Sequence, residues 1–197
     1  MTRYLAPVAP AAAELRERGS RFLARLVPAA DEAQAKARLA ALAAEHPDAT
    51  HHCWAWRLGW PPRERASDAG EPSGTAGPPI LRALGRGELS DALLVVSRWF
   101  GGVKLGKGGL VRAYGAVARE AVAAARTEPR LLRREVELEI PYPHLGAVQR
   151  LLQPPEVELV RQSYGAGVRW TLAVAEARLP EVRAVAAALG LELVERS

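Results

Sequence analysis

Hydrophobic and polar residues alternate in short blocks along the chain, and the spacing of these blocks predicts a mixture of strands and helices. The first part of the chain is expected to form strands within residues 4–27, a helix at 31–45, a strand at 50–58, an exposed loop at 60–66, a short helix after Pro78, a strand at 92–96 and a helix at 110–126. The helix at 31–45 is alanine-rich, has Asp31 as its N-cap and is followed by Pro47. The run at 92–96 is apolar throughout, as expected of a central strand buried on both faces.

The strand at 50–58 has two chemically different faces, because the side chains of a strand point alternately to opposite sides. One face carries His52, Trp54, Trp56 and Leu58, and the other carries His51, Cys53, Ala55 and Arg57. Aromatic residues at strand spacing usually face a core, so we expect the tryptophan face to be buried. Exposed tryptophans would instead indicate a surface for stacking on bases or for a protein partner.

Beyond residue 130 the pattern predicts a second domain. We expect a strand at 135–140, a helix at 143–152, a hairpin of strands at 157–164 and 168–175, a helix at 180–190 and a last strand at 191–195. This βαββαβ order is the ferredoxin-like split arrangement. The segment 127–130 contains Pro129 and is typical of a domain boundary. The sequence therefore predicts an α+β protein with two domains, residues 1–130 and 131–197.

The composition is typical of a folded protein of the cytoplasm. Hydrophobic residues make up 49% of the chain, which is ample for a packed core. No apolar run approaches the roughly 18 residues of a membrane span, and the first residues lack the pattern of a signal peptide. The single cysteine, Cys53, excludes an internal disulfide. We therefore expect a cytoplasmic protein without a membrane partner.

Positive charge is concentrated in the first part of the chain. Residues 1–132 hold 19 Lys and Arg against 13 Asp and Glu, whereas residues 133–197 hold 8 against 9. A basic surface favours acidic partners, chiefly nucleic acid. Only three of the basic residues are lysines, and two of them, Lys104 and Lys107, lie in one glycine-rich loop.

Glycine is concentrated between residues 70 and 115, which hold 11 of the 17 glycines. Five of them fall close together, at Gly101, Gly102, Gly106, Gly108 and Gly109. Each glycine costs roughly 0.5–1 kcal/mol relative to alanine in regular structure, so this loop must need positive φ angles or a close approach of its backbone. A bound ligand is one reason for such an approach, and tight packing on a neighbouring strand is the other.

The glycine loop leads into the helix at 110–126, and the two together would suit an anion. Free N–H groups at the start of a helix attract negative charge. Arg112, Arg119 and Arg126 recur every seven residues and share one ridge of the helix, which Gly115 leaves open, although an arginine ridge alone is usually a solvated face. The candidate residues for binding nucleic acid or another anion are Arg98, Gly101, Gly102, Lys104, Gly106, Lys107, Gly108, Gly109, Arg112 and Arg119. The strict P-loop string is missing, so we expect neither nucleotide hydrolysis nor a cofactor.

A second glycine-rich stretch, residues 67–79, combines acidic and hydroxylic side chains. Its motif residues are Ser73, Gly74, Thr75 and Gly77. Ser73 or Thr75 is expected to cap the helix that follows. The acidic residues Asp68 and Glu71 have candidate partners for ion pairs in Lys104, Lys107 and Arg98.

An enzyme is the alternative to a binding protein. His51 and Cys53 share a strand face, and a thiolate assisted by histidine is a known design of nucleophile. Asp68 and Glu71 would then supply acid–base groups. A lone cysteine is more often a small buried hydrophobe, and three well-spaced metal ligands are not evident. We therefore expect no metal, and we regard catalysis as the less favoured function.

Four motifs resemble the Impact/YigZ family, over nearly the whole chain. The long ones are DAGEPSGTAGPPIL at 68–81 and VVSRWFGGVKLGKGGLVRAYG at 95–115, and the short ones are SRFLA at 20–24 and DATHHCWAW at 48–56. The resemblance implies a first domain like the second domain of small-subunit ribosomal protein five and a ferredoxin-like second domain. Together these resemble the fourth and fifth domains of elongation factor G. The chain departs from the family at Ala69 and Trp99, where a second acidic residue and a tyrosine are usual.

The resemblance also implies a function in translation. Eukaryotic Impact relatives are translation regulators that bind a ribosome-associated coactivator, and the ferredoxin-like second domain is typical of the bacterial branch. We therefore expect a translation-associated regulatory protein that binds RNA or the ribosome through its basic glycine-rich surface. A translation-regulatory protein and a second copy of the chain are further candidate partners. A pure protein-interaction module remains an alternative.

Overall fold

The computed structural model describes residues 3–196. Within the described residues the chain divides into two compact units, residues 4–130 and residues 131–196 together with Arg3. Both units combine strands with helices, which confirms the predicted α+β class. None of the helices in the described range is long and apolar enough to cross a membrane.

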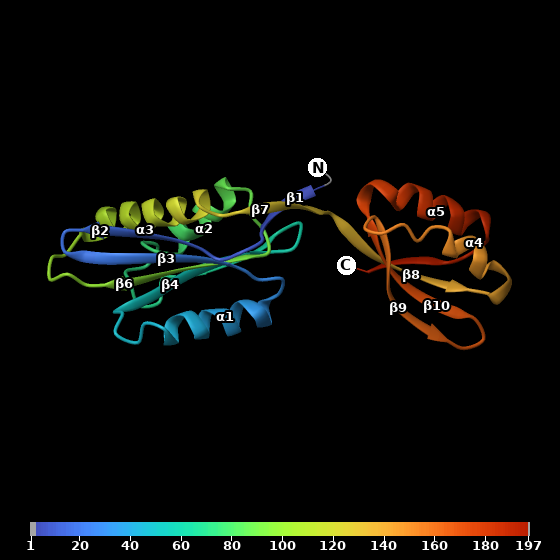
Figure 1. Cartoon of the computed structure of the whole chain (residues 1–197), viewed down its shortest axis with the longest axis horizontal. Coiled ribbons are helices and arrows are strands. Elements are labelled where there is room, and N and C mark those ends of the chain that lie inside the picture. Colours follow the sequence, from blue (N-terminus) through green and yellow to red (C-terminus); the bar gives the residue numbers. More distant parts are fainter. Residues whose placement is uncertain (1–2, 197) are drawn as a thin grey trace. The chain divides into compact units, whose positions relative to one another are not determined.

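The first unit is built on a five-stranded sheet with the order β2-β3-β6-β4-β5. Its strands are β1 Arg3–Pro7, β2 Ala11–Glu17, β3 Ser20–Pro28, β4 His51–Leu58, β5 Arg63–Ser67, β6 Ala92–Trp99 and β7 Thr127–Leu131, and its helices are α1 Glu32–Ala44, α2 Gly77–Arg86 and α3 Gly106–Ala123. All neighbours in the large sheet are antiparallel, and β1 pairs with β7 in a separate two-stranded sheet. Figure 1 shows α1 on one face of the large sheet and α2 and α3 on the other.

The alternation along β4 divides the core into two layers. Cys53 and Ala55 pack with α2 and α3, whereas Trp56 and Leu58 pack with α1 and Trp54 borders the same cluster. The predicted burial of the tryptophan face is therefore confirmed. Strand β6 lies at the centre of the sheet and is buried along almost its whole length, as its apolar run predicts.

The prediction of an exposed loop at residues 60–66 is wrong for residues 63–66, because Arg63–Ser67 forms the edge strand β5. This strand pairs with β4, so that Leu58 faces Arg63 and Trp54 faces Ser67. Its first three residues are charged and exposed. Charged side chains protect an edge strand from pairing with other chains, and they also remove the apolar pattern by which a strand is found in a sequence.

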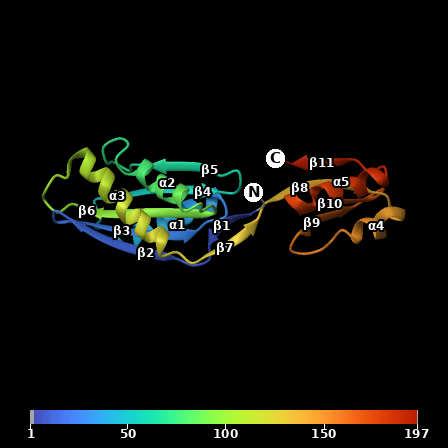
Figure 2. The ribbon, with the colours of Figure 1, turned by 90° about the horizontal axis from the view of Figure 1, so that it is seen from above.

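Two boundaries also differ from those expected. Helix α3 begins at Gly106, four residues before the predicted start, and ends at Ala123. Its first turn holds Gly108 and Gly109, whose low helix propensity concealed it. The segment 127–130, expected as a boundary between domains, forms most of β7, and the first compact unit ends at residue 130. In the view of Figure 2, α2 and α3 run side by side over the sheet, and they pack against each other.

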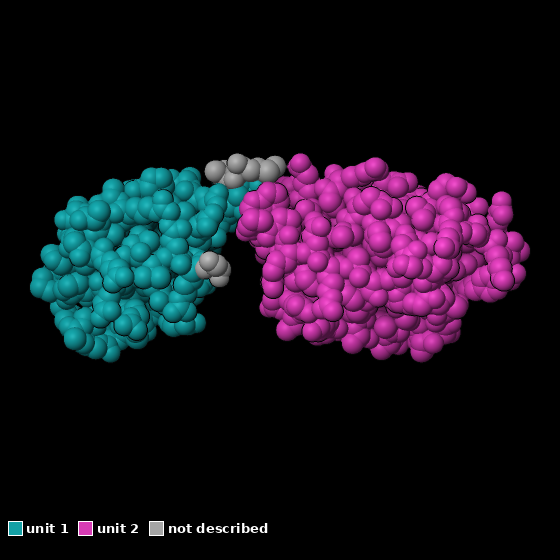
Figure 3. Space-filling model, turned by 180° about the vertical axis from the view of Figure 1, so that it is seen from behind, with its two compact units in different colours: residues 1–3, 131–197 teal, residues 4–130 magenta. Residues whose placement is uncertain are grey.

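The second unit, drawn in teal in Figure 3, is built of strands and helices in the predicted βαββαβ order. Its elements are β8 Arg133–Ile140, a 3-10 turn at Tyr142–His144, α4 Leu145–Gln149, β9 Val157–Tyr164, β10 Val168–Ala175, a 3-10 turn at Glu176–Arg178, α5 Leu179–Ala188 and β11 Leu193–Arg196. The sheet order β11-β8-β10-β9 is that of a ferredoxin-like fold. Leu138, Leu172 and Val182 lie at the centre of its core. Helix α4 is shorter than expected.

Candidate anion-binding surface

The loop between β5 and α2 is shaped by the carboxylate of Asp68. This side chain accepts hydrogen bonds from the backbone N–H groups of Gly74 at 2.8 Å, Ala76 at 2.9 Å and Gly77 at 2.9 Å. Partial burial acts to raise the pKa of Asp68, but the backbone N–H donors together outweigh it and bring the pKa below its usual range. Asp68 is thus committed to its own loop and to the start of α2, and forms no ion pair among the described residues.

The predicted capping of α2 by a hydroxyl group is wrong. The N-cap residue is Ala76, which has no side-chain cap. The Thr75 hydroxyl donates instead to the Pro72 carbonyl oxygen at 2.6 Å, and Ser73 is exposed. Asp68, eight residues before Ala76, caps the helix instead, because its carboxylate accepts the backbone N–H groups of Ala76 and Gly77. The loop folds back far enough to bring this side chain to the start of α2.

Glu71, from the same loop, forms a buried ion pair with Arg98 of β6. Arg98 Nη1 donates to Glu71 Oε1 at 2.6 Å, and the two side chains are only 7% and 3% exposed. Arg98 Nη2 donates to the Ser20 hydroxyl at 3.3 Å, and the same hydroxyl accepts the backbone N–H of Gly101 at 3.2 Å. The predicted pairing of Glu71 with Arg98 is confirmed. The inclusion of Arg98 in an anion-binding surface is corrected, because its guanidinium lies inside the protein.

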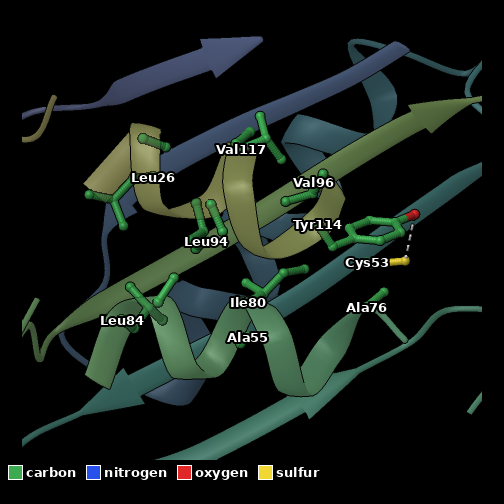
Figure 4. Packing of buried hydrophobic residues seen from close by; sticks show 14 of the residues in the cluster. Leu26, Cys53, Ala55, Ala76, Ile80, Leu84, Leu94, Val96, Tyr114 and Val117 are labelled. Carbon is green, nitrogen blue, oxygen red and sulfur yellow. Dashed lines mark hydrogen bonds between the residues drawn. The ribbon is translucent and has the colours of Figure 1, made fainter. Parts of the chain in front are cut away.

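The network continues from Glu71 into α3 and β4. The Tyr114 hydroxyl donates to Glu71 Oε1 at 2.8 Å, and the Cys53 thiol lies 3.4 Å from the Tyr114 oxygen and 2.9 Å from the Asp68 carbonyl oxygen (Figure 4). Burial raises the pKa of Cys53 to about 12 and also raises the pKa of Tyr114. Both groups are therefore protonated at neutral pH and act as hydrogen-bond donors.

This arrangement gives no support to the nucleophile that His51 and Cys53 suggested. Cys53 is fully buried, and a thiol with a raised pKa is the opposite of a reactive thiolate. His51 Nδ1 lies 2.9 Å from the Ala69 carbonyl oxygen, which can only accept, so His51 fixes the loop. Within residues 3–196 no three His, Cys, Asp or Glu side chains are grouped closely enough to hold a metal ion.

The glycine loop after β6 packs closely on the turn between β2 and β3. A Cβ atom on Gly101 would overlap the backbone of Gly19 and Ser20, so only glycine allows this approach. Gly102 and Gly106 have φ angles of +85° and +69°, which glycine adopts without strain. Tight packing, the second of the two reasons given for the glycines, therefore accounts for Gly101, and backbone conformation accounts for Gly102 and Gly106.

The start of α3 is exposed and basic. Its N-cap residue, Leu105, provides no side-chain cap, which leaves N–H groups of the first turn without a side-chain acceptor. Lys104 and Lys107 are exposed beside this turn, and Gly108 is exposed within it. Arg112 follows on the same helix. We call Lys104, Lys107, Arg112 and Arg119 the basic surface; all four are exposed, and none has a carboxylate partner among the described residues.

Two arginines that the sequence pattern did not indicate lie beside this surface. Arg82 and Arg86 of α2 line one groove together with Arg112 and Arg119 of α3. The groove has a volume of about 460 Å³, and Gly115 is part of its lining. The spacing of four residues places Arg82 and Arg86 on one face of α2, but only the packing of α2 beside α3 brings that face to the ridge of α3.

The chain is similar to known proteins along most of its length. Residues 18–122 match the model of the Impact N-terminal domain, and residues 138–187 match that of a domain of unknown function, DUF1949. An IMPACT family member in the pol 5' region of Thermus thermophilus is 46% identical over 153 residues, which are 78% of this chain and 83% of that protein. The IMPACT family member YigZ of Escherichia coli is 35% identical over 93% of this chain and 92% of its own length.

A solved structure has the same fold over the whole chain. The crystal structure of a hypothetical protein, 34% identical in sequence, covers 100% of this chain and 98% of its own chain with a TM-score of 0.79. Its likeness extends over both units and supports the fold described above.

Replacing Arg98 by Met should destabilise the first unit by about 3–5 kcal/mol, because it leaves the Glu71 carboxylate buried without its partner. Urea unfolding measures this loss. The double variant Arg98→Met/Glu71→Leu should recover part of it, since no charge then remains buried. As a control, Arg16→Met breaks an exposed pair with Glu14 and should leave the unfolding midpoint unchanged. An Arg98→Met variant as stable as the wild type would contradict the structural role of the pair.

Cys53 should resist alkylation in the native protein. Its thiol is buried and its pKa is about 12, so iodoacetamide at pH 8 should modify it only as fast as the first unit opens. In urea above the unfolding transition the same thiol should react at the rate of a free cysteine. Mass spectrometry after timed quenching measures both rates. Rapid modification of the native protein would restore Cys53 as a candidate nucleophile.

Asp68 should stabilise the protein in a way that depends on pH. A carboxyl group whose pKa is lowered by folding contributes stability above its unfolded pKa of about 3.9, and the contribution is lost as the pH falls through the lower folded value. Wild type should therefore exceed Asp68→Asn by about 1 kcal/mol at pH 7, and the difference should shrink toward pH 2. Urea unfolding at several pH values measures it. A difference independent of pH would show that the charge of the Asp68 carboxylate does not contribute to the stability of the protein.

Proposed function

We propose that this chain, which belongs to the Impact family, is a translation-associated regulatory protein that binds RNA or the ribosome through its basic surface. The observation that carries the proposal is that Lys104, Lys107, Arg112 and Arg119 are exposed on one continuous stretch of chain without carboxylate partners in the described range. Uncompensated positive charges of this kind favour a polyanion, because its phosphates release counterions when the charges replace them.

The contrast between the two units supports a specific role for this charge. In the second unit most arginines are paired with a carboxylate, at Arg133, Arg134, Arg169, Arg178, Arg183 and Arg196. Such pairs cancel much of the field that a nucleic acid would experience. The excess of positive charge in the first unit is therefore available to a ligand, whereas the charges of the second unit mostly satisfy one another.

The backbone around the basic surface adds to its suitability. The first turn of α3 presents N–H groups without a side-chain cap, and the helix dipole places partial positive charge there. Lys104 lies just before this turn and Lys107 lies within it, so both can contribute positive charge to a phosphate bound there. Exposed glycines at Gly102 and Gly108 allow a nucleic-acid backbone to approach closely.

The translation context rests on the family. The resemblance implies regulators of translation, so RNA, free or in the ribosome, is the polyanion that we propose as the partner. A catalytic alternative has no comparable support, because the Cys53 thiol is buried and protonated at neutral pH.

Lys104→Ala/Lys107→Ala should weaken binding to RNA and reduce its dependence on salt. Each phosphate contact contributes a slope of roughly 0.7–0.9 to the plot of log affinity against log salt. The loss of affinity between 50 and 200 mM salt should therefore be about tenfold smaller in the variant. Fluorescence anisotropy with labelled RNA, and co-sedimentation with ribosomal subunits, measure the effect.

The matched control is Arg150→Ala/Arg161→Ala, which removes two exposed charges without carboxylate partners from the second unit. This control should bind as the wild type does. Binding that ignores salt and both lysines, or that falls equally in the control, would refute the proposed surface.

A further inference from the structure

The groove between α2 and α3 combines two kinds of lining. We call it the arginine groove; it is lined by Pro79, Arg82, Ala83, Arg86, Val111, Arg112, Gly115, Ala116 and Arg119. Its apolar members are buried or partly buried, and we call them the floor. Its four arginines are exposed and form the rim. A phosphate group would contact only the arginines, whereas the apolar floor favours a ligand that also has an apolar part.

The rim places positive charge on both sides of the floor. Arg82 and Arg86 are one turn apart on α2, about 6 Å along its axis, and Arg112 and Arg119 are about 10 Å apart along α3. None of the four is paired with a carboxylate in the described part of the chain. A ligand in the groove is therefore flanked by cations on two walls, which suits a chain that carries negative charge at regular intervals.

The size of the groove favours a single strand. Its open space, of about 460 Å³, holds one nucleotide but not both strands of a duplex. A duplex would have to remain outside, on the rim. The volume of about 460 Å³ is that of a pocket for a small ligand, which fits a nucleotide that is not paired.

The charged residues of the rim are all arginines, and an arginine side chain can bind a base as well as a phosphate. A guanidinium is planar, binds phosphate through two N–H groups at once and also stacks on a base, whereas an ammonium does neither. The apolar floor and the faces of the guanidinium groups can thus hold an unstacked base while other N–H groups hold its phosphates. An acidic protein segment would use the charge of the rim but not its planar faces.

We propose that the arginine groove binds an unpaired nucleotide of single-stranded RNA, with the base against the apolar floor and the flanking phosphates on the arginine rim. The inference rests on the proposed function and deepens it, because it names the form of RNA that this surface selects. Lys104 and Lys107 then attract any RNA by charge, and the groove distinguishes single strands from duplexes.

The test compares a labelled single-stranded RNA with its duplex at one salt concentration. Wild type should prefer the single strand at least about fivefold, the lower end of what one stacked base contributes. Arg82→Ala/Arg86→Ala should lose this preference while still binding duplex through the lysines. Lys36→Ala/Arg38→Ala removes two charges from α1, on the opposite face of the sheet, and should keep the preference.

A second variant tests the floor without changing charge. A Cβ atom on Gly115 would lie 3.3 Å from the flexible end of Arg119 and 3.8 Å from Pro79, so the Cβ of Gly115→Leu requires only a small movement of Arg119, and we expect the rest of the side chain to project into the groove. A leucine also favours the helix over glycine. This variant should fold, as circular dichroism and urea unfolding measure, and should lose the preference for single strands while its salt dependence stays that of the wild type.

Three results would overturn the inference. Equal affinity of wild type for single strand and duplex would remove the selectivity; if both still depend on Lys104 and Lys107, the proposed function stands without the groove. An unchanged preference in Gly115→Leu would show that no base occupies the floor. Binding of poly-glutamate as tightly as RNA, lost in Arg82→Ala/Arg86→Ala, would assign the groove to an acidic protein segment. Absence of any RNA binding would refute the proposed function itself.

Discussion

The buried ion pair between Arg98 and Glu71 is the interaction on which the arrangement of the first unit depends. Burying two charges costs several kcal/mol for each, and the cost is offset only when geometry and further hydrogen bonds are good. Here Glu71 Oε1 also accepts from Tyr114, and Arg98 also donates to Ser20. The pair therefore joins β6, the loop before α2, helix α3 and the start of β3. None of these elements can shift without leaving a buried charge short of a hydrogen-bond partner.

The basic surface is positioned by this interior network. Tyr114 lies on α3 between Arg112 and Arg119, so its hydrogen bond to Glu71 fixes the rotation of the helix about its axis. The same rotation turns the arginines outward and toward α2. At the other end, Ser20 holds the backbone of Gly101 and thus anchors the loop that carries Lys104. The buried hydrogen-bond network therefore determines where the exposed lysines and arginines of the basic surface lie.

Periodicity predicted the parts of the fold that depend on apolar contacts, such as the two faces of β4, the central position of β6 and the βαββαβ order of the second unit. It failed where polar residues carry out a structural task. Strand β5 was missed because its exposed charges give no strand pattern, and the cap on α2 was assigned to hydroxyls because Asp68 acts from eight residues away. Arg98 was predicted to lie on the surface because the sequence alone does not show that Glu71 pairs with it inside the protein.

The candidate site was predictable on α3 but not on α2, and the reason is physical. Lys104, Lys107 and the ridge of Arg112 and Arg119 follow from local sequence, because a helix fixes which residues share a face. A groove needs a second wall, and that wall is α2, which packs beside α3 with Gly115 in the lining between them. The packing of the two helices therefore brings four arginines that are separate in the sequence into one site, and a substitution at Gly115 tests that site without changing a charge.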